Sequence, residues 1–188
     1  MTPTTTAAPA RRRYDAYDIR LFDALRAGAL AAATFLILYY ATLGLLPWIF
    51  AYPITRFPVG AWAHRMDLAQ FLGSLVHPPY PTPLNWGLGL ALMAGTLISL
   101  AVVYAFLLSW VMQNSDTAKG LGFGLANGAG LLLFVTIANG LHPAIMRNAL
   151  ADTGLLMLGW SNWAPVQILL VHAVYGAILG RLYQPKYR

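Results

Sequence analysis

The sequence contains no cysteine and no glutamate, and only 10% of its residues are charged. Without cysteine, the chain has no disulfides, no thiolate metal ligands, no haem attached through cysteine and no cysteine nucleophile. It also lacks paired carboxylates, a phosphate-binding glycine loop after a strand, and a serine, histidine and aspartate set that could act together. We therefore expect a protein that is not an enzyme, and these patterns predict neither a cofactor nor a metal site.

Long apolar runs dominate what is present. Hydrophobic residues make up 59% of the chain and the mean hydropathy is +0.59, outside the range of ordinary soluble domains. Gly87–Gln113 runs for 27 positions without a charged side chain, whereas about 20 apolar residues suffice for a helix to cross a bilayer. Four such stretches predict an all-α membrane protein, a single four-helix transmembrane domain of residues 24–183 with spans at 24–52, 86–113, 119–141 and 163–183.

The distribution of positive charge predicts the orientation of these spans. Nine Lys and Arg residues flank the predicted inner ends and three flank the outer ends, so both termini are expected in the cytoplasm. Residues 1–23 are predicted to be a disordered basic tail in which Arg11, Arg12 and Arg13 bind lipid headgroups, and residues 184–188 a second cytoplasmic tail. The net charge of +6 forms no basic stripe on a soluble domain. We therefore expect no nucleic-acid partner and predict a location in a bacterial inner membrane.

Residues 53–85 are predicted to form a long outer loop that is rich in aromatic residues and proline. Apolar residues repeat at helical spacing within it, which predicts a short amphipathic helix lying on the surface. These residues are Trp62, Met66, Leu68, Phe71, Leu72, Leu75 and Val76. The nearby His64, Asp67 and His77 match no metal-binding spacing, so we assign them to the solvated face of that helix.

The two halves of the chain look like repeats of one helical hairpin. A shift of 96 residues lays Gly44–Pro47 on Gly140–Pro143, and a shift of 71 residues lays Val103–Tyr104 on Val174–Tyr175. The two shifts differ by 25 residues, so a single insertion of that length between the two spans of the first hairpin reconciles them. We therefore predict a duplicated hairpin.

Small residues recur at every fourth position within each predicted span. Residues four apart share one helix face, and small side chains there let backbones approach closely where lipid supplies little hydrophobic drive for association. These ridges either close a compact bundle or turn in part toward another protein, and the sequence does not divide them. Their members are Ala24, Gly28 and Ala32; Gly87, Ala91, Gly95 and Ser99; Gly120, Gly124 and Gly128; and Gly176 and Gly180.

His172 is the only histidine or charged residue deep inside a predicted span, which makes it the candidate cofactor-binding residue. Its alternatives are a neutral imidazole hydrogen bonded to a neighbouring helix, a contact to haem or quinone, and proton transfer. Thr96 lies at similar depth and Asn127 a little lower, so both are candidate partners. A bis-histidine haem would need a second histidine at that depth, and His142 lies near the outer end of the third span.

Two segments carry a resemblance to a known family. Val171–Tyr183, with a histidine followed by a tyrosine and two glycines, and Lys119–Gly124, which opens the third span, resemble a family of small bacterial four-helix integral membrane proteins of unknown function. In that family the last helix likewise carries a histidine, then a tyrosine and a glycine, then a second glycine near its inner end. The resemblance implies a four-helix membrane fold and no known activity, so it assigns no role to His172, Tyr175 or Gly176.

Small size, four small-residue ridges, a proline-rich outer loop and a basic arm favour a non-catalytic accessory subunit of a larger membrane complex. A respiratory or photosynthetic electron-transfer complex is the preferred assembly, with other membrane protein subunits and membrane lipids as partners. One alternative is a self-contained homo-oligomeric carrier or pore for a small neutral molecule, with the two hairpins as its halves. A second alternative is a subunit that contacts haem or quinone through His172.

Overall fold

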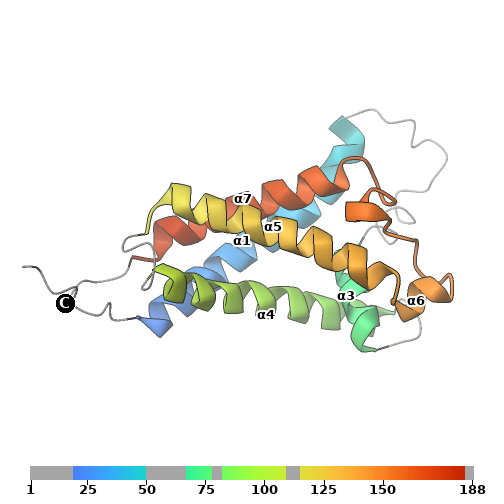
Figure 1. Cartoon of the computed structure of the whole chain (residues 1–188), viewed down its shortest axis with the longest axis horizontal. Helices are drawn as coiled ribbons and strands as arrows, with labels where there is room; N and C mark the ends of the chain where they lie inside the picture. Colours follow the sequence, from blue (N-terminus) through green and yellow to red (C-terminus); the bar gives the residue numbers. More distant parts are fainter. Residues whose placement is uncertain (1–18, 50–66, 78–81, 109–114, 185–188) are drawn as a thin grey trace, which may run out of the picture.

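The computed structural model describes residues 19–49, 67–77, 82–108 and 115–184, without the side chains of 44–49. These residues form helices, turns and connecting segments, and none of them lies in a strand. The elements in chain order are α1 (Leu21–Ile49), α3 (Leu68–Val76), α4 (Pro83–Leu107), α5 (Thr117–Asn139), α6 (Pro143–Met146), the 3-10 helix η3 (Leu155–Met157) and α7 (Ala164–Leu182) (Figure 1).

Four of these helices, α1, α4, α5 and α7, are long and apolar enough to cross a membrane. The prediction of an all-helical chain with four such helices is confirmed. The observed bounds differ by a few residues, since α1 begins at Leu21, inside the predicted tail, and α4 begins at Pro83 and not at Trp86. Arg11, Arg12 and Arg13 lie outside the described residues.

Side-chain caps explain where α4 and α5 begin. The Thr82 hydroxyl accepts a hydrogen bond from the Asn85 backbone N–H at 3.2 Å, and Pro83 occupies the first helical position, where a missing N–H costs little. The Asp116 carboxylate likewise accepts from the backbone N–H of Lys119 at 2.7 Å. These polar caps start both helices a few residues before the apolar runs by which the sequence located them.

The four long helices pack in the order α4, α1, α7, α5. α1 contacts both α4 and α7, and α5 packs along α7 (Figure 1). One end of the bundle, at left in Figure 1, holds the start of α1, the end of α4, the start of α5 and the end of α7. It carries Arg20, Arg26, Lys119 and Arg181, and we call it the basic end. The other end holds α3, α6 and η3, and we call it the capped end.

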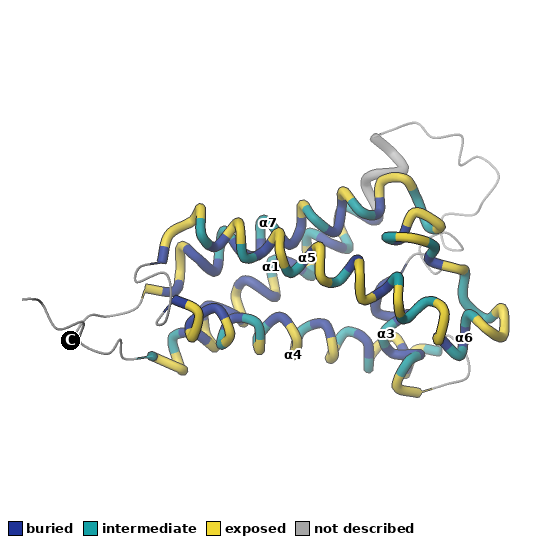
Figure 2. Tube along the Cα trace, viewed as in Figure 1, coloured by how far each residue is buried: buried dark blue, intermediate teal, exposed yellow. Residues whose placement is uncertain are grey.

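Large aromatic rings fill the core of the bundle. Phe35 and Tyr39 of α1, Tyr104 of α4 and Tyr175 of α7 each expose 1% or less of their surface. Phe35 meets Tyr175 edge to face with centroids 6.5 Å apart, and Tyr104 contacts Phe123 of α5 at 5.0 Å. Exposed positions recur along the outer sides of the long helices (Figure 2). That outer surface is the one that a membrane-embedded bundle turns to lipid or to a partner.

Candidate functional site

The glycine ridges of α5 and α7 face each other. A Cβ added at Gly120 would contact the Gly176 carbonyl oxygen and lie 2.7 Å from the Cα of Gly180. One added at Gly176 would lie 2.7 Å from the Cα of Gly124. Cβ atoms do not approach backbone atoms that closely, so glycine is what allows these helices their separation. The ridges of both helices are therefore used inside the chain.

The ridge of α1 also packs inside the chain. A Cβ added at Gly28 would lie 2.5 Å from the Cβ of Ala101 and 3.4 Å from the Cα of Ile98, both on α4. Ala24 and Ala32 expose 0% and 2% of their surface. This ridge joins α1 to the side of α4 that carries Ala101, and it has no room for a further partner.

The ridge of α4 faces outward. Gly87, Ala91, Gly95 and Ser99 are all exposed, and a Cβ added at Gly87 or Gly95 would meet nothing within 4 Å. The Ser99 hydroxyl donates to the Gly95 carbonyl at 2.8 Å, so its polarity is satisfied within the helix. The structure therefore shows which ridges pack inside the chain. The ridges of α1, α5 and α7 close the bundle, and the ridge of α4 does not.

A second outward set of small residues lies on α5. Gly122, Ala126 and Gly130 are exposed, and a Cβ at either glycine would meet nothing within 4 Å. Sequence reasoning missed this set because it recorded only the ridge that begins at Gly120. The signal was the same spacing of four residues, displaced by two positions.

His172 lies on α7 with 4% of its surface exposed. Its Nδ1 lies 2.8 Å from the carbonyl oxygen of Ile168, one turn earlier on the same helix. A carbonyl only accepts hydrogen bonds, so Nδ1 carries the proton and Nε2 holds the lone pair. The ring meets Phe35 of α1 edge to face with centroids 4.7 Å apart. His172 thus fills the space between α7 and α1.

Among the described residues, the structure shows a bond from His172 within its own helix and none to Thr96 or Asn127, the candidate partners on neighbouring helices. Thr96 is exposed on α4, and the side-chain amide of Asn127 donates to the Phe123 carbonyl of its own helix at 2.8 Å. The side chains of His172 and Asn127 therefore both donate to a carbonyl one turn earlier on their own helix. Helix periodicity offers such an acceptor to a polar side chain at any depth, so depth alone does not identify its partner. A cofactor contact through Nε2 stays a prediction.

The loop before α4 contains a buried helix and not an exposed one. Gly73 of α3 lies directly against α4, where an added Cβ would be 2.5 Å from the Asn85 carbonyl carbon and 3.0 Å from the Gly89 nitrogen. A Cβ added at Gly89 would lie 2.7 Å from the Cα of Ala69. The predicted surface position is therefore wrong, because backbone-to-backbone packing through two glycines holds α3 against α4. Sequence reasoning missed both glycines.

Polar side chains also tie α3 to its surroundings. Asp67, assigned to a solvated face, is 7% exposed; its carboxylate caps α3 and accepts from the Tyr40 hydroxyl at 3.0 Å. The Tyr39 hydroxyl accepts from the backbone N–H of Leu68 at 3.0 Å. From α4, the Asn85 side-chain amide donates to the His77 carbonyl at 2.6 Å. The start and end of α3 are therefore each fixed to a different long helix, and His64 lies outside the described residues.

His142 joins α3 to the segment after α5. It is fully buried, and its Nδ1 accepts from the Ala144 backbone N–H at 3.2 Å, so Nε2 carries the proton. That proton is donated to the Phe71 carbonyl of α3 at 2.9 Å. Both ring nitrogens are thus used by the backbone, one to cap α6 and one to hold α3.

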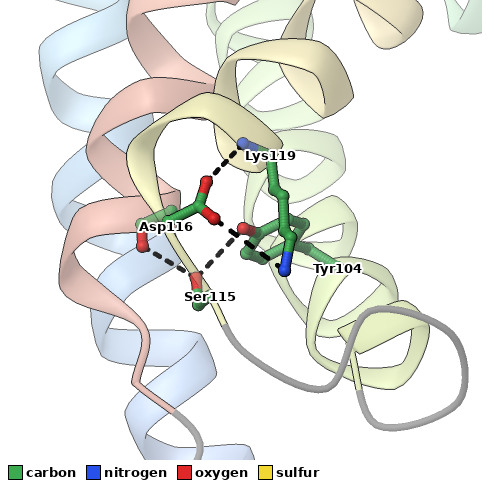
Figure 3. A network of polar contacts seen from close by, with 5 residues as sticks. Tyr104, Ser115, Asp116 and Lys119 are labelled. Carbon is green, nitrogen blue, oxygen red and sulfur yellow. Dashed lines mark hydrogen bonds and ion pairs between the residues drawn. The ribbon is translucent and has the colours of Figure 1, made fainter.

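A second network ties three helices at the basic end (Figure 3). The Ser115 hydroxyl donates to the Gly180 carbonyl of α7 at 2.7 Å and lies 3.0 Å from the Tyr104 hydroxyl of α4. The next residue, Asp116, caps α5 and pairs with the ammonium group of Lys119 at 3.8 Å. The start of α5 is thereby anchored to the ends of α4 and α7.

The four long apolar helices indicate a multi-pass helical membrane protein. Comparison of the chain with protein-family models, with curated proteins and with solved structures finds no match. The resemblance to small bacterial four-helix membrane proteins stays a prediction.

Proposed function

We propose that this protein is a non-catalytic accessory subunit of a larger membrane complex, and that α4 is the helix that binds its partner. The observation that carries the proposal is the unfilled ridge of Gly87, Ala91, Gly95 and Ser99. The ridges of α1, α5 and α7 are occupied by neighbouring helices of the same chain, so the bundle does not need the fourth ridge in order to close.

Small residues on one face favour the association of helices in lipid. Small residues spaced four apart let a second helix approach until backbones touch, which gains dispersion contacts that lipid chains provide less well. The ridge of α4 spans thirteen residues, or about 18 Å of helix at about 1.5 Å per residue. The exposed set on α5 spans nine residues from Gly122 to Gly130. The longer ridge of α4 is therefore the preferred interface.

We place the complex in a bacterial inner membrane with the basic end in the cytoplasm. Arg20, Arg26, Lys119 and Arg181 gather at that end, which supports the orientation through the positive-inside rule. An electron-transfer complex, respiratory or photosynthetic, is the preferred assembly, because a chain devoted to packing suits the periphery of a large set of catalytic subunits. The partners are then other membrane subunits and lipids.

We further propose that the bundle is a duplicated hairpin. The shift of 96 residues carries Gly28 onto Gly124, and the shift of 71 residues carries Ala101 onto His172. In each half these two positions touch, since Cβ atoms added at Gly28 and Gly124 would meet Ala101 and His172 respectively. Matching contacts at matching positions support descent from one hairpin, with α3 in the extra length of the first loop.

The proposal is tested by widening the ridge in the native membrane. Tagged Gly95→Leu is expressed in place of the natural protein, extracted in mild detergent, and analysed by native gel and mass spectrometry for stoichiometric partners. Because a Cβ at Gly95 meets nothing within 4 Å, the variant is expected to fold normally and to lose its partner. Far-UV circular dichroism of the purified chain checks the fold.

Gly122→Leu is the matched control, since it adds the same side chain to an equally open position on α5. Loss of partners in Gly95→Leu but not in Gly122→Leu supports α4 as the interface, and the reverse result moves the interface to α5. Partners retained by both variants refute helix packing through either ridge. A homo-oligomer without other subunits refutes the accessory role and favours the carrier.

A further inference from the structure

A pocket opens at the basic end between α1 and the end of α7. Its volume is about 360 Å³, and it is lined by Asp23, Arg26, Ala27, Leu30, Leu182 and Gln184. That volume lies near the lower limit of small-molecule sites, about 300–1,000 Å³. The pocket is therefore the right size for a headgroup and the first carbons of a chain, and too small for a whole lipid.

The lining changes from charged to apolar along the axis of α1. Asp23 and Arg26 lie in the first turns, and Leu30 follows seven residues after Asp23, about 10 Å deeper at about 1.5 Å per residue. Leu182, at the end of α7, and Gln184, just beyond it, likewise place an apolar group before a polar one. This order matches a phospholipid, whose charged headgroup lies at the membrane surface and whose acyl chains run inward.

The two charges in the lining have opposite signs. Arg26 has no hydrogen bond or ion pair to another described residue, so its guanidinium is available to an anion. Asp23 pairs with Arg20 at 3.4 Å, but both side chains remain more than 40% exposed and Arg20 does not line the pocket. The pocket thus presents one cation beside one anion, a complement to a ligand that carries both a phosphate and an ammonium group.

Tyr183 lies between Leu182 and Gln184 of the pocket lining. This residue follows the last residue of α7, exposes 1% of its surface, and packs against Tyr104 with ring centroids 6.4 Å apart. Burial raises the pKa of its hydroxyl, and a hydrogen bond with the backbone of Arg20 offsets part of that rise. Tyr183 thus packs the end of α7 against α4 beside the pocket.

We propose that this pocket binds one phospholipid with a protonated amine headgroup, of the phosphatidylethanolamine type. Arg26 binds the phosphate, Asp23 accepts hydrogen bonds from the ammonium group, and one acyl chain lies along Leu30 and Leu182. Phosphatidylcholine has no N–H to donate to Asp23, and phosphatidylglycerol has no ammonium group to offset the carboxylate. This site is separate from the ridge of α4 and does not depend on the proposed partner.

Native mass spectrometry of the full chain in nanodiscs tests the site. Discs contain equal parts of phosphatidylethanolamine, phosphatidylcholine and phosphatidylglycerol, and the lipids kept after gentle activation are counted. The wild-type protein is expected to retain phosphatidylethanolamine roughly tenfold over either competitor, as one or two charge-assisted hydrogen bonds allow. Arg26→Gln should abolish retention, and Asp23→Asn should remove the preference over phosphatidylcholine.

Arg181→Gln is the matched control, because it removes an exposed arginine at the same end outside the pocket lining. It is expected to bind like the wild type. Equal retention by Arg26→Gln, or a wild-type preference for phosphatidylglycerol, overturns the proposal. Water-soluble glycerophosphoethanolamine in excess should not displace the lipid, and displacement would instead assign the site to a free phosphoester. Circular dichroism verifies that each variant is folded.

Discussion

Gly124→Ala is the sharpest test of the seam between α5 and α7. The added Cβ would contact the His172 carbonyl oxygen, and it would lie 2.9 Å from the carbon of that carbonyl and 3.0 Å from the Cα of Gly176. Ordinary van der Waals contact begins at 3.4 Å. All three obstructing atoms belong to backbone, so no side chain can turn aside and the helices must move apart by roughly 1–1.5 Å to clear the carbonyl oxygen.

The magnitude follows from two opposing effects. Forcing extra volume into a well-packed interface costs about 1–3 kcal/mol, and a gap of this size also weakens neighbouring contacts along the seam. Replacing glycine by alanine in a helix recovers up to about 1 kcal/mol of backbone propensity. We therefore expect a net destabilisation of about 1–2 kcal/mol for Gly124→Ala.

Gly122→Ala is the control, two residues away on the exposed face of α5. Its Cβ meets nothing within 4 Å, so it should gain the propensity term alone and be stabilised by up to about 1 kcal/mol. The assay is unfolding of each purified variant by sodium dodecyl sulfate titrated into mild detergent, followed by circular dichroism. Equal stability of the two variants would refute the backbone seam, since the same substitution must then be tolerated on both faces.

Two further hydrogen bonds give predictions of their own. The Tyr175 hydroxyl donates to the Leu97 carbonyl of α4 at 2.5 Å. In the same unfolding assay, Tyr175→Phe should lower the free energy of unfolding by about 0.6 kcal/mol and at most by about 1.7 kcal/mol, the range for hydrogen bonds between membrane helices. A larger loss would show that the hydroxyl does more than join α7 to α4. His142→Asn keeps a side-chain cap for α6, but the asparagine side chain is too short to reach Phe71. Hydrogen exchange of the α3 amides should therefore accelerate roughly tenfold, as the loss of one buried hydrogen bond implies. Unchanged exchange would show that glycine packing alone holds α3.

The apolar runs sufficed to predict the four long helices, because a chain that crosses lipid must satisfy its backbone within each helix and must be apolar over about 20 residues. The small-residue spacing predicted close packing but not its direction. Gly120 and Gly122 differ by two positions on α5, yet one faces the Gly176 backbone and the other faces open space. Which of two glycine faces turns inward depends on the partner helix, and that information is not local to the segment.

The polar residues were harder to place. The sequence assigns Asp67 to a solvated face and places His142 only near the outer end of the third span, yet 7% and 0% of their surfaces are exposed. Asp67 accepts from the Tyr40 hydroxyl of α1 and from a backbone N–H of α3, and His142 bonds the Phe71 carbonyl of α3 and a backbone N–H of α6, so burial costs little. No hydropathy pattern indicates such pairing, because the partners are brought together by the packing of α3 on α4 and not by sequence spacing.

The half of α4 nearest the capped end carries both the start of the outward ridge and the contact with α3. Gly89 lies against the backbone of Ala69 in α3, whereas Gly87, two residues earlier, faces outward with nothing within 4 Å. Glycine occupies both positions, so α4 has no side chain toward α3 at Gly89 and none toward the outside at Gly87. A partner helix that packs on Gly87 would therefore be separated from α3 by the backbone of α4 alone. Tight packing transmits displacement because interiors are nearly incompressible. A partner on the ridge would therefore stiffen the docking of α3.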